Sequence, residues 1–154
     1  MGPIVAVALA GMAAALAADC TMLPVAPTSL QLSGTWDGTG SDAQGAEVIS
    51  WVMTQTGNTV RGTVSTRAVD PADGSCASCH KNKTGTFTGT IVGSSLTLTM
   101  FFPTGGDVPT PICSVTMVAT ADGVTDARIT STYTGADTCE GPFTDGTFTM
   151  DHRP

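Results

Sequence analysis

From Leu32 onward, the chain is a series of short runs with strand character, separated by glycine-containing turn signals. Apolar residues alternate with threonine or glycine in several runs, as in LTLTM at 96–100 and FTGTI at 87–91. A period of two is typical of a strand that buries one face, and no helical periodicity occurs beyond the N-terminal segment. We expect eight strands, at 33–39, 46–55, 59–67, 84–92, 95–102, 112–120, 124–134 and 143–152.

The lengths of the connections constrain how these strands are arranged. The short connections are 56–58, 93–94 and 121–123, and the long ones are 40–45, 68–83, 103–111 and 135–142. Alternate connections of an up-and-down meander lie at opposite ends, so all the long loops would share one end. Closing eight antiparallel strands removes their exposed edges. We therefore predict an all-β fold, an eight-stranded antiparallel up-and-down barrel with long loops at one end, the mouth.

Length and charge limit the function classes. The 154 residues are 41% hydrophobic, enough for one domain with its own core. The net charge is −7, with only six lysine and arginine residues. Because nucleic-acid affinity depends on neutralising phosphates, we expect no nucleic-acid partner.

The N-terminal segment predicts export. Residues 1–20, MGPIVAVALAGMAAALAADC, form an apolar, alanine-rich run that is short for a membrane span and typical of a secretory signal. Ala15-Leu16-Ala17 offers a cleavage site, although an uncleaved anchor is an alternative. Cys20 is a candidate for lipidation in a bacterial lipoprotein. We expect a signal at 1–20, a linker at 21–31, the barrel at 32–154, and a periplasmic, outer-membrane-anchored or extracellular location in a bacterium.

Cys76, Cys79 and His80 spell C-x-x-C-H within the longest loop, and three interpretations are open. Both thiols could attach a c-type haem, with His80 as the proximal iron ligand and Met100 better placed than His152 to be the sixth ligand. The cysteines could instead form disulfides, with each other or with further cysteines. Two thiolates and His80 also make three ligands of a zinc site.

Two further cysteines lie beside long loops at the expected mouth. Cys113 begins the sixth strand, and Cys139 lies in the loop before the eighth. The antiparallel arrangement brings these strand ends together, so a Cys113–Cys139 disulfide is the preferred pairing. Export suits such a bond, because thiols are oxidised outside the cytoplasm.

A resemblance to a known superfamily rests on both ends of the barrel sequence. SGTWDGT at 33–39 resembles the G-x-W signature on the first strand of lipocalins and their calycin relatives. In that superfamily, a basic residue at the end of the last strand packs across the tryptophan and closes the barrel. The resemblance therefore implies that Arg153 packs over Trp36, as a cation–π contact. Residues 30–154 are similar to small secreted bacterial lipocalin-like lipoproteins.

The function hypotheses follow from these features. No G-x-S-x-G, H-E-x-x-H or phosphate-binding glycine loop is present, so we expect no enzyme. The first hypothesis is an exported binding module for a small apolar ligand, either free or tethered to a membrane through acylated Cys20. Its ligand would contact Met100, Phe101 and Phe102. The alternative is a monohaem electron-transfer protein with a redox partner.

Overall fold

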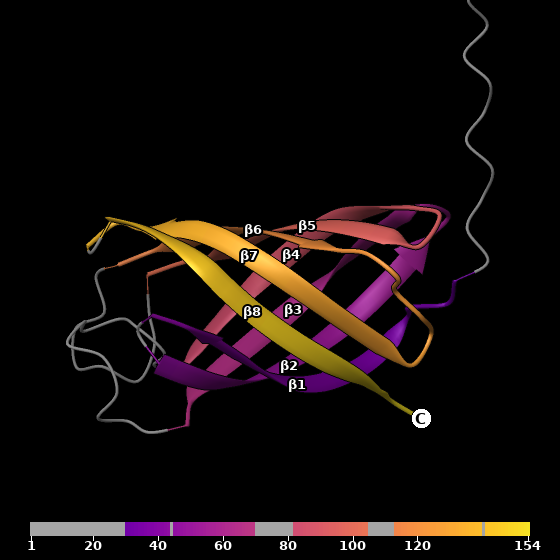
Figure 1. The fold of residues 1–154 in the computed structure, drawn as a ribbon, viewed down its shortest axis with the longest axis horizontal. Helices are drawn as coiled ribbons and strands as arrows, with labels where there is room; N and C mark the ends of the chain where they lie inside the picture. Colours follow the sequence, from indigo (N-terminus) through magenta and orange to yellow (C-terminus); the bar gives the residue numbers. More distant parts are fainter. Residues whose placement is uncertain (1–29, 44, 70–81, 105–112, 140) are drawn as a thin grey trace, which may run out of the picture.

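The computed structural model describes residues 30–43, 45–69, 82–104, 113–139 and 141–154. Its strands are β1 (Gly34–Asp42), β2 (Gly45–Thr56), β3 (Thr59–Ala68), β4 (Lys83–Val92), β5 (Ser95–Phe102), β6 (Val115–Ala121), β7 (Arg128–Asp137) and β8 (Gly141–Arg153). They form a closed barrel in sequence order (Figure 1). All neighbours are antiparallel, and β8 closes the ring by pairing with β1. The predicted fold class is confirmed.

The predicted alternation of short and long connections is only partly correct. Residues 40–45 and 135–142 were expected to be long loops, but β1 runs to Asp42 before β2 starts at Gly45, and β7 runs to Asp137 before β8 starts at Gly141. The glycines and serine that indicated a loop at 40–45 are held in strands, because partner strands on both sides continue the ladder: Ser41 pairs with Ala46 and Thr147. Tertiary pairing overrides turn propensity there.

The β6–β7 connection, in contrast, is longer than predicted. It was expected to be a tight turn at 121–123, but β6 ends at Ala121 and β7 begins at Arg128. The Thr125 hydroxyl organises this longer turn by accepting hydrogen bonds from the backbone N–H groups of Ala127 (3.4 Å) and Arg128 (3.0 Å). The long β3–β4 and β5–β6 connections agree with expectation.

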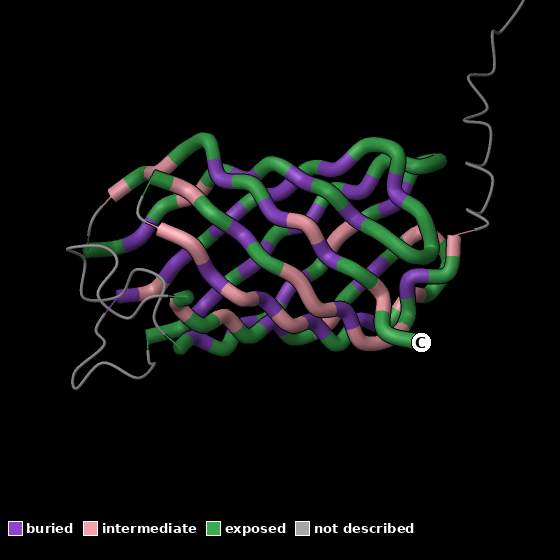
Figure 2. Tube along the Cα trace, turned by 60° about the horizontal axis from the view of Figure 1, so that its bottom comes forward, coloured by how far each residue is buried: buried purple, intermediate pink, exposed green. Residues whose placement is uncertain are grey.

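The barrel interior is a packed core. Buried residues alternate with more exposed ones along most of the strands, as the tube in Figure 2 shows, and the pattern is least regular in β1 and in the first half of β8. An aromatic group occupies the centre, with Trp51 lying 5.3 Å from Phe87 and 5.1 Å from Phe148 between ring centroids. Gly146 makes room for a further ring, since a Cβ there would overlap the side chain of Tyr133. Eight strands leave an interior that side chains can fill, and here they do.

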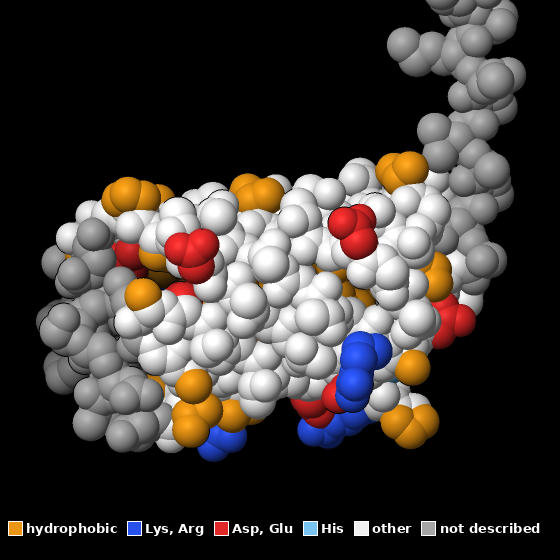
Figure 3. All heavy atoms as spheres, in the orientation of Figure 1, with side chains coloured by type: hydrophobic (Ala, Val, Ile, Leu, Met, Phe, Trp, Pro, Cys, Tyr) orange, Lys and Arg blue, Asp and Glu red, His pale blue; other side chains and the backbone are white. Residues whose placement is uncertain are grey.

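The outer wall is polar but carries few charges (Figure 3). One continuous row of threonines crosses six strands through paired positions: Thr59, Thr90, Thr97, Thr120, Thr132 and Thr147. β-branched side chains suit the pleated surface, and cross-strand threonine pairs stabilise it by roughly 0.2–1 kcal/mol each. This wall explains how a folded domain can have only 12% charged residues.

The N-terminal predictions lie outside the described residues. These are the signal at 1–20, including Cys20, and the linker at 21–31 apart from its last two residues. Within the described ranges there is no helix long and apolar enough to cross a membrane.

Candidate functional site

The two ends of the barrel are built differently. We call the end that holds the β2–β3, β4–β5 and β6–β7 connections and the C-terminus the floor (Figure 1). The end that holds the β1–β2, β3–β4, β5–β6 and β7–β8 connections is the mouth. The predicted site residues divide between these two ends.

Trp36 closes the floor with partners that differ from the prediction. Its ring stacks on His152, at 4.5 Å between centroids and 12° between planes, instead of on Arg153. Arg153 pairs in register with Thr35, one residue before Trp36, so the pleat directs its side chain outward, where it forms an ion pair with Asp37. The expected Trp36–Arg153 contact is therefore wrong by one residue.

Hydrogen bonds complete the floor beneath Trp36. The indole Nε1 donates to the carbonyl oxygen of Leu32 at 2.9 Å, and Leu32 is itself fully buried. The Leu32 N–H donates to Gln55 Oε1 at 2.8 Å, while Gln55 Nε2 donates to the carbonyl oxygen of Leu30 at 2.9 Å. Gly34 is required here, because a Cβ at this position would overlap His152 Nε2. The floor is a plug whose polar groups are paired.

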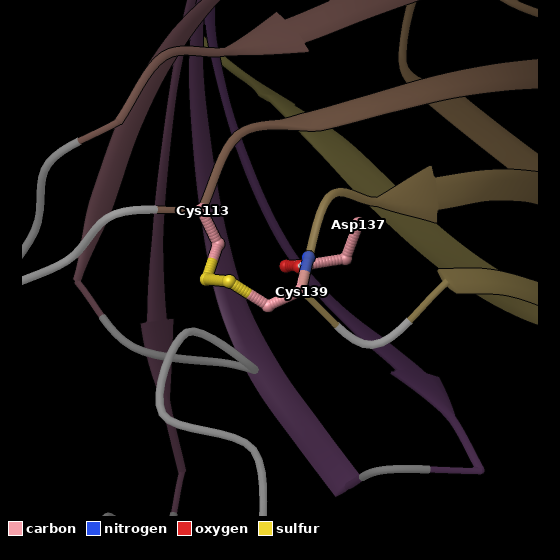
Figure 4. A group of neighbouring side chains, drawn as sticks. All are labelled: Cys113, Asp137 and Cys139. Carbon is pink, nitrogen blue, oxygen red and sulfur yellow. Dashed lines mark hydrogen bonds between the residues drawn. A yellow bond between two sulfur atoms is a disulfide. The ribbon is translucent and has the colours of Figure 1, made fainter.

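A disulfide joins two connections at the mouth. Cys113 and Cys139 are bonded across 26 residues of sequence, with their Cα atoms 5.5 Å apart (Figure 4). Asp137 Oδ1 accepts from the Cys139 N–H at 2.6 Å, and buried Lys83 donates to the carbonyl oxygen of Cys113 at 3.3 Å. The predicted pairing is confirmed. Asp137 and the two sulfurs lie close enough to hold a metal ion, but the disulfide occupies both sulfurs.

The C-x-x-C-H segment lies outside the described residues, so the haem, disulfide and zinc interpretations of Cys76, Cys79 and His80 stay predictions. Two residues considered with them are placed. Met100 is buried inside the barrel, and His152 lies at the floor, away from the end that carries this loop.

A small cavity lies in the upper lumen, the part of the interior next to the mouth. Its volume is about 10 Å³, and it is lined by Glu47, Ile49, Trp51, Val64, Thr66, Met100, Phe102, Met117 and Phe148. Of the three predicted ligand contacts, Met100 and Phe102 line this cavity. Phe101 does not, because neighbouring strand residues point to opposite faces, and it is 48% exposed on the outer wall.

Sequence reasoning missed three large side chains that line the same cavity: Trp51, Met117 and Phe148. Each follows the inward alternation of its strand, so the pattern could have assigned it to the interior. The level at which each meets Met100 depends on the register between strands. Met100 pairs with Met117, and this pairing is set by the closed barrel.

A buried carboxyl group, that of Glu47, lines the cavity, and a buried tyrosine interacts with it electrostatically. Glu47 is only 7% exposed, and the Tyr133 hydroxyl donates to Asp42 Oδ2 at 3.1 Å. Burial, the nearby carboxylates of Glu47 and Asp42, and this hydrogen bond all raise the pKa of Tyr133. Tyr133 therefore stays protonated and acts as a donor at physiological pH.

Trp51 is an exception among the buried polar groups. Its side chain is 1% exposed, and its Nε1 has no hydrogen-bond partner. Within the described residues, no other buried side-chain nitrogen or oxygen lacks a partner. Trp36 lies directly opposite Trp51 in the β1–β2 register, and its Nε1 is fully paired. Two tryptophans that are partners in the ladder thus differ in whether their indole N–H has a hydrogen-bond acceptor.

A second hollow lies on the outer wall. This groove has a volume of about 520 Å³ and is lined by Asp37, Val48, Ser50, Ser65, Thr66, Arg67, Asn82, Lys83, Thr84 and Arg153. Hydroxyl and charged groups dominate it, in contrast to the apolar lining of the upper lumen.

Comparisons with known proteins show similarity at the level of the fold and not at the level of sequence. No family model matches the chain, and no curated protein sequence matches it. Among solved structures, it is similar to EF1p2_mFAP2b bound to DFHBI, with a TM-score of 0.60 and 12% identity over 79% of this chain and 94% of that one. Rv2717c from M. tuberculosis is also similar, with a TM-score of 0.44 and 12% identity over 80% of this chain and 93% of the other. At such identities, the first similarity shows a shared barrel fold.

Proposed function

We propose that this protein is a ligand-binding barrel that takes a small, largely apolar molecule into the upper lumen beneath the mouth. The observation that carries the proposal is the cavity there, in which Met100 and Met117 line one space together with Trp51, Phe102 and Phe148. Burial of apolar ligand surface against such a lining is favourable by about 25 cal/mol per Å².

The size of the cavity limits the ligand. A volume of about 10 Å³ corresponds to roughly one water molecule, so a ligand must displace side chains to enter. Two of the lining residues are methionines, whose unbranched side chains with three rotatable bonds re-pack readily. Met117 is also 8% exposed, which places it where movement is least hindered. A ligand with a single ring suits this lumen.

The lumen suits an apolar ligand better than the outer groove does. An apolar molecule in the groove would lie against Arg67, Arg153 and hydroxyl groups, which would lose contact with water without gaining hydrogen bonds. The structural neighbour EF1p2_mFAP2b is bound to DFHBI, which supports small-molecule binding as a use of this fold. The apolar lining of the cavity supports the upper lumen, rather than the outer groove, as the binding site.

We propose in addition that the protein is exported from the cytoplasm. The Cys113–Cys139 disulfide supports an oxidising compartment, where such bonds persist. Together with the apolar segment at 1–20, it favours a secreted barrel, with acylation of Cys20 as its membrane tether. Mass spectrometry of the exported protein tests this step, because cleavage and acylation each shift the mass.

Binding can be tested by titrating the full-length protein with α-methylstyrene, a neutral single-ring probe, and following backbone and side-chain NMR shifts. We expect shifts at Trp51, Met100 and Phe102, and none at the side chain of Phe101, which lies between the last two in sequence but faces outward. Met117→Ala should tighten binding, since the ligand no longer has to move that side chain. Arg67→Ala, in the outer groove, is the matched control and should leave the Kd unchanged.

Two results would overturn the proposal. One is the absence of saturable binding up to the solubility limit of the probe. The other is a set of shifts confined to the outer groove, with Arg67→Ala weakening the binding and Met117→Ala leaving it unchanged.

A further inference from the structure

The unpaired indole N–H of Trp51 is costly to the folded protein. A buried donor without an acceptor destabilises a protein, and such groups are rare in native structures. The nitrogen is enclosed in the barrel, on a residue that is 1% exposed, and that residue lines the upper-lumen cavity. An acceptor brought in by a ligand would remove this cost.

The indole ring is held firmly in position. Phe87 contacts it at 5.3 Å with an interplanar angle of 47°, and Phe148 meets it edge-on at 5.1 Å and 80°. Aromatic packing of this kind fixes the ring, and hence the direction of the N–H bond, before any ligand arrives. The donor is therefore preorganised, which lowers the entropic cost of forming a hydrogen bond to it.

The remaining lining defines what can accept this hydrogen bond. Met100, Met117, Phe102 and Phe148 offer apolar surface, so most of the ligand must be apolar. The buried carboxylate of Glu47 lines the same cavity and disfavours a second negative charge. A cation cannot accept from an N–H group. An uncharged acceptor atom on an apolar frame, such as a ketone or ether oxygen, fits all three conditions.

Resting on the proposed function, we infer that Trp51 Nε1 is the recognition donor of the lumen, and that the ligand is a neutral, largely apolar molecule whose oxygen or nitrogen acceptor takes its hydrogen bond. Met100 and Met117 open the space, and Trp51 selects among the molecules that enter. A single water molecule is the competing occupant, since the cavity volume is close to the minimum for one.

Two probes of matched shape test this inference. Acetophenone carries a carbonyl oxygen where α-methylstyrene carries a methylene group, and the two are otherwise alike. Their dissociation constants are measured for the unaltered protein, Trp51→Phe and Trp36→Phe. Trp36→Phe is the matched control, because its indole N–H already donates to Leu32.

The expected result is a change in the ratio of the two affinities. Trp51→Phe should weaken acetophenone relative to α-methylstyrene by roughly tenfold, the size of one buried hydrogen bond. Trp36→Phe should leave this ratio unchanged. In the unaltered protein, the Trp51 indole N–H resonance should move downfield with acetophenone and far less with α-methylstyrene, a readout that needs no variant.

The failures of the two proposals are distinguishable. If both probes bind and their ratio is the same in Trp51→Phe, or the indole resonance does not respond to acetophenone, the donor role is overturned and the proposed function stands. A persistent cross-relaxation signal between the indole proton and water in the acetophenone complex overturns the donor role in the same way. If neither probe binds, the proposed function itself fails.

Discussion

Trp36 and Trp51 are paired in the β1–β2 register, but the Trp36 ring helps to close the floor whereas the Trp51 ring lines the cavity of the upper lumen. The Trp36 indole stacks on His152 and donates to Leu32, a residue tied in turn to Gln55. The Trp51 indole packs between Phe87 and Phe148 and donates to nothing. The first environment is complete without a ligand, and the second leaves one donor unused.

The two ends also differ in how they are held together. At the floor, the segment before β1 folds under the barrel and is tied by hydrogen bonds to Gln55 and to Asp126, whose Oδ1 accepts from the Gln31 N–H at 2.8 Å. At the mouth, a covalent Cys113–Cys139 bond joins two connections. A covalent rim can stay in place while side chains beneath it re-pack. We therefore expect the hydrogen-bonded floor to contribute most to stability, and the side chains beneath the mouth to re-pack most readily.

Truncating the floor should have the largest effect on stability. We expect Trp36→Ala to lower the free energy of unfolding by about 3–5 kcal/mol, since it removes a fully buried ring and its hydrogen bond. Urea denaturation followed by circular dichroism measures the loss. Phe101→Ala on the outer wall is the control and should change stability by well under about 1 kcal/mol. Equal losses in the two variants would contradict the picture of a stabilising floor.

Removing the Cys113–Cys139 disulfide at the mouth should destabilise the protein somewhat less than Trp36→Ala does. The double variant Cys113→Ala with Cys139→Ala releases a loop of 26 residues, and the chain-entropy model gives a loss of about 3.5 kcal/mol, in the lower part of the range expected for Trp36→Ala. Amide hydrogen exchange should speed up at the mouth ends of β6 and β7 and stay slow around Trp36. Uniform acceleration through both ends would break the proposed division between floor and mouth.

Replacing each indole by phenylalanine isolates the hydrogen bond. Trp36→Phe leaves the Leu32 carbonyl without its donor, whereas Trp51→Phe removes a donor that has no partner. We expect Trp36→Phe to be more destabilising than Trp51→Phe by about 1 kcal/mol, as measured by paired urea titrations. The reverse order would show that Trp51 has an acceptor in the unliganded protein.

The smallest effect should come from the outer wall near the floor. Arg128 hydrogen-bonds Asp151 at 2.7 Å and so holds the pKa of that carboxyl below its usual value of 3.8. This stabilisation is present above the unfolded-state pKa and is lost as pH falls through the lower folded-state pKa. Asp151→Asn should therefore reduce the acid sensitivity of stability below about pH 4, slightly, because both side chains are exposed. A larger effect at high salt than at low salt would be inconsistent with an ion pair.

The strand pattern predicted the fold because a period of two is a local property that survives in any β architecture. The runs LTLTM and FTGTI lie within β5 and β4, as predicted. The Cys113–Cys139 disulfide was predictable because the antiparallel arrangement brings the two strand ends together. Connection lengths were less predictable. The glycines and serine at 40–45 indicate a loop in isolation, but they pair once strands lie on both sides.

The site was predictable only in part, for a related reason. Alternation places Met100 and Phe102 on one face and Phe101 on the other, and the structure agrees. The same rule shows that Arg153 and His152 cannot both reach Trp36, but the choice between them depends on register. No local signal indicates which residues meet the indole in the upper lumen or whether its N–H finds an acceptor.

By itself, the sequence determined most of the strands and the side of each strand that is buried, because these depend on neighbours within a few residues. It also indicated the antiparallel order, because strands joined by short connections pair with each other. The tertiary structure decided that His152 covers Trp36, that the lumen is filled, and that Trp51 keeps an unpaired donor beside Met100 and Met117. Those outcomes depend on register and closure around the whole barrel, which join residues from opposite ends of the domain sequence. Contacts between residues so far apart in the sequence are determined by how the side chains pack in the closed barrel.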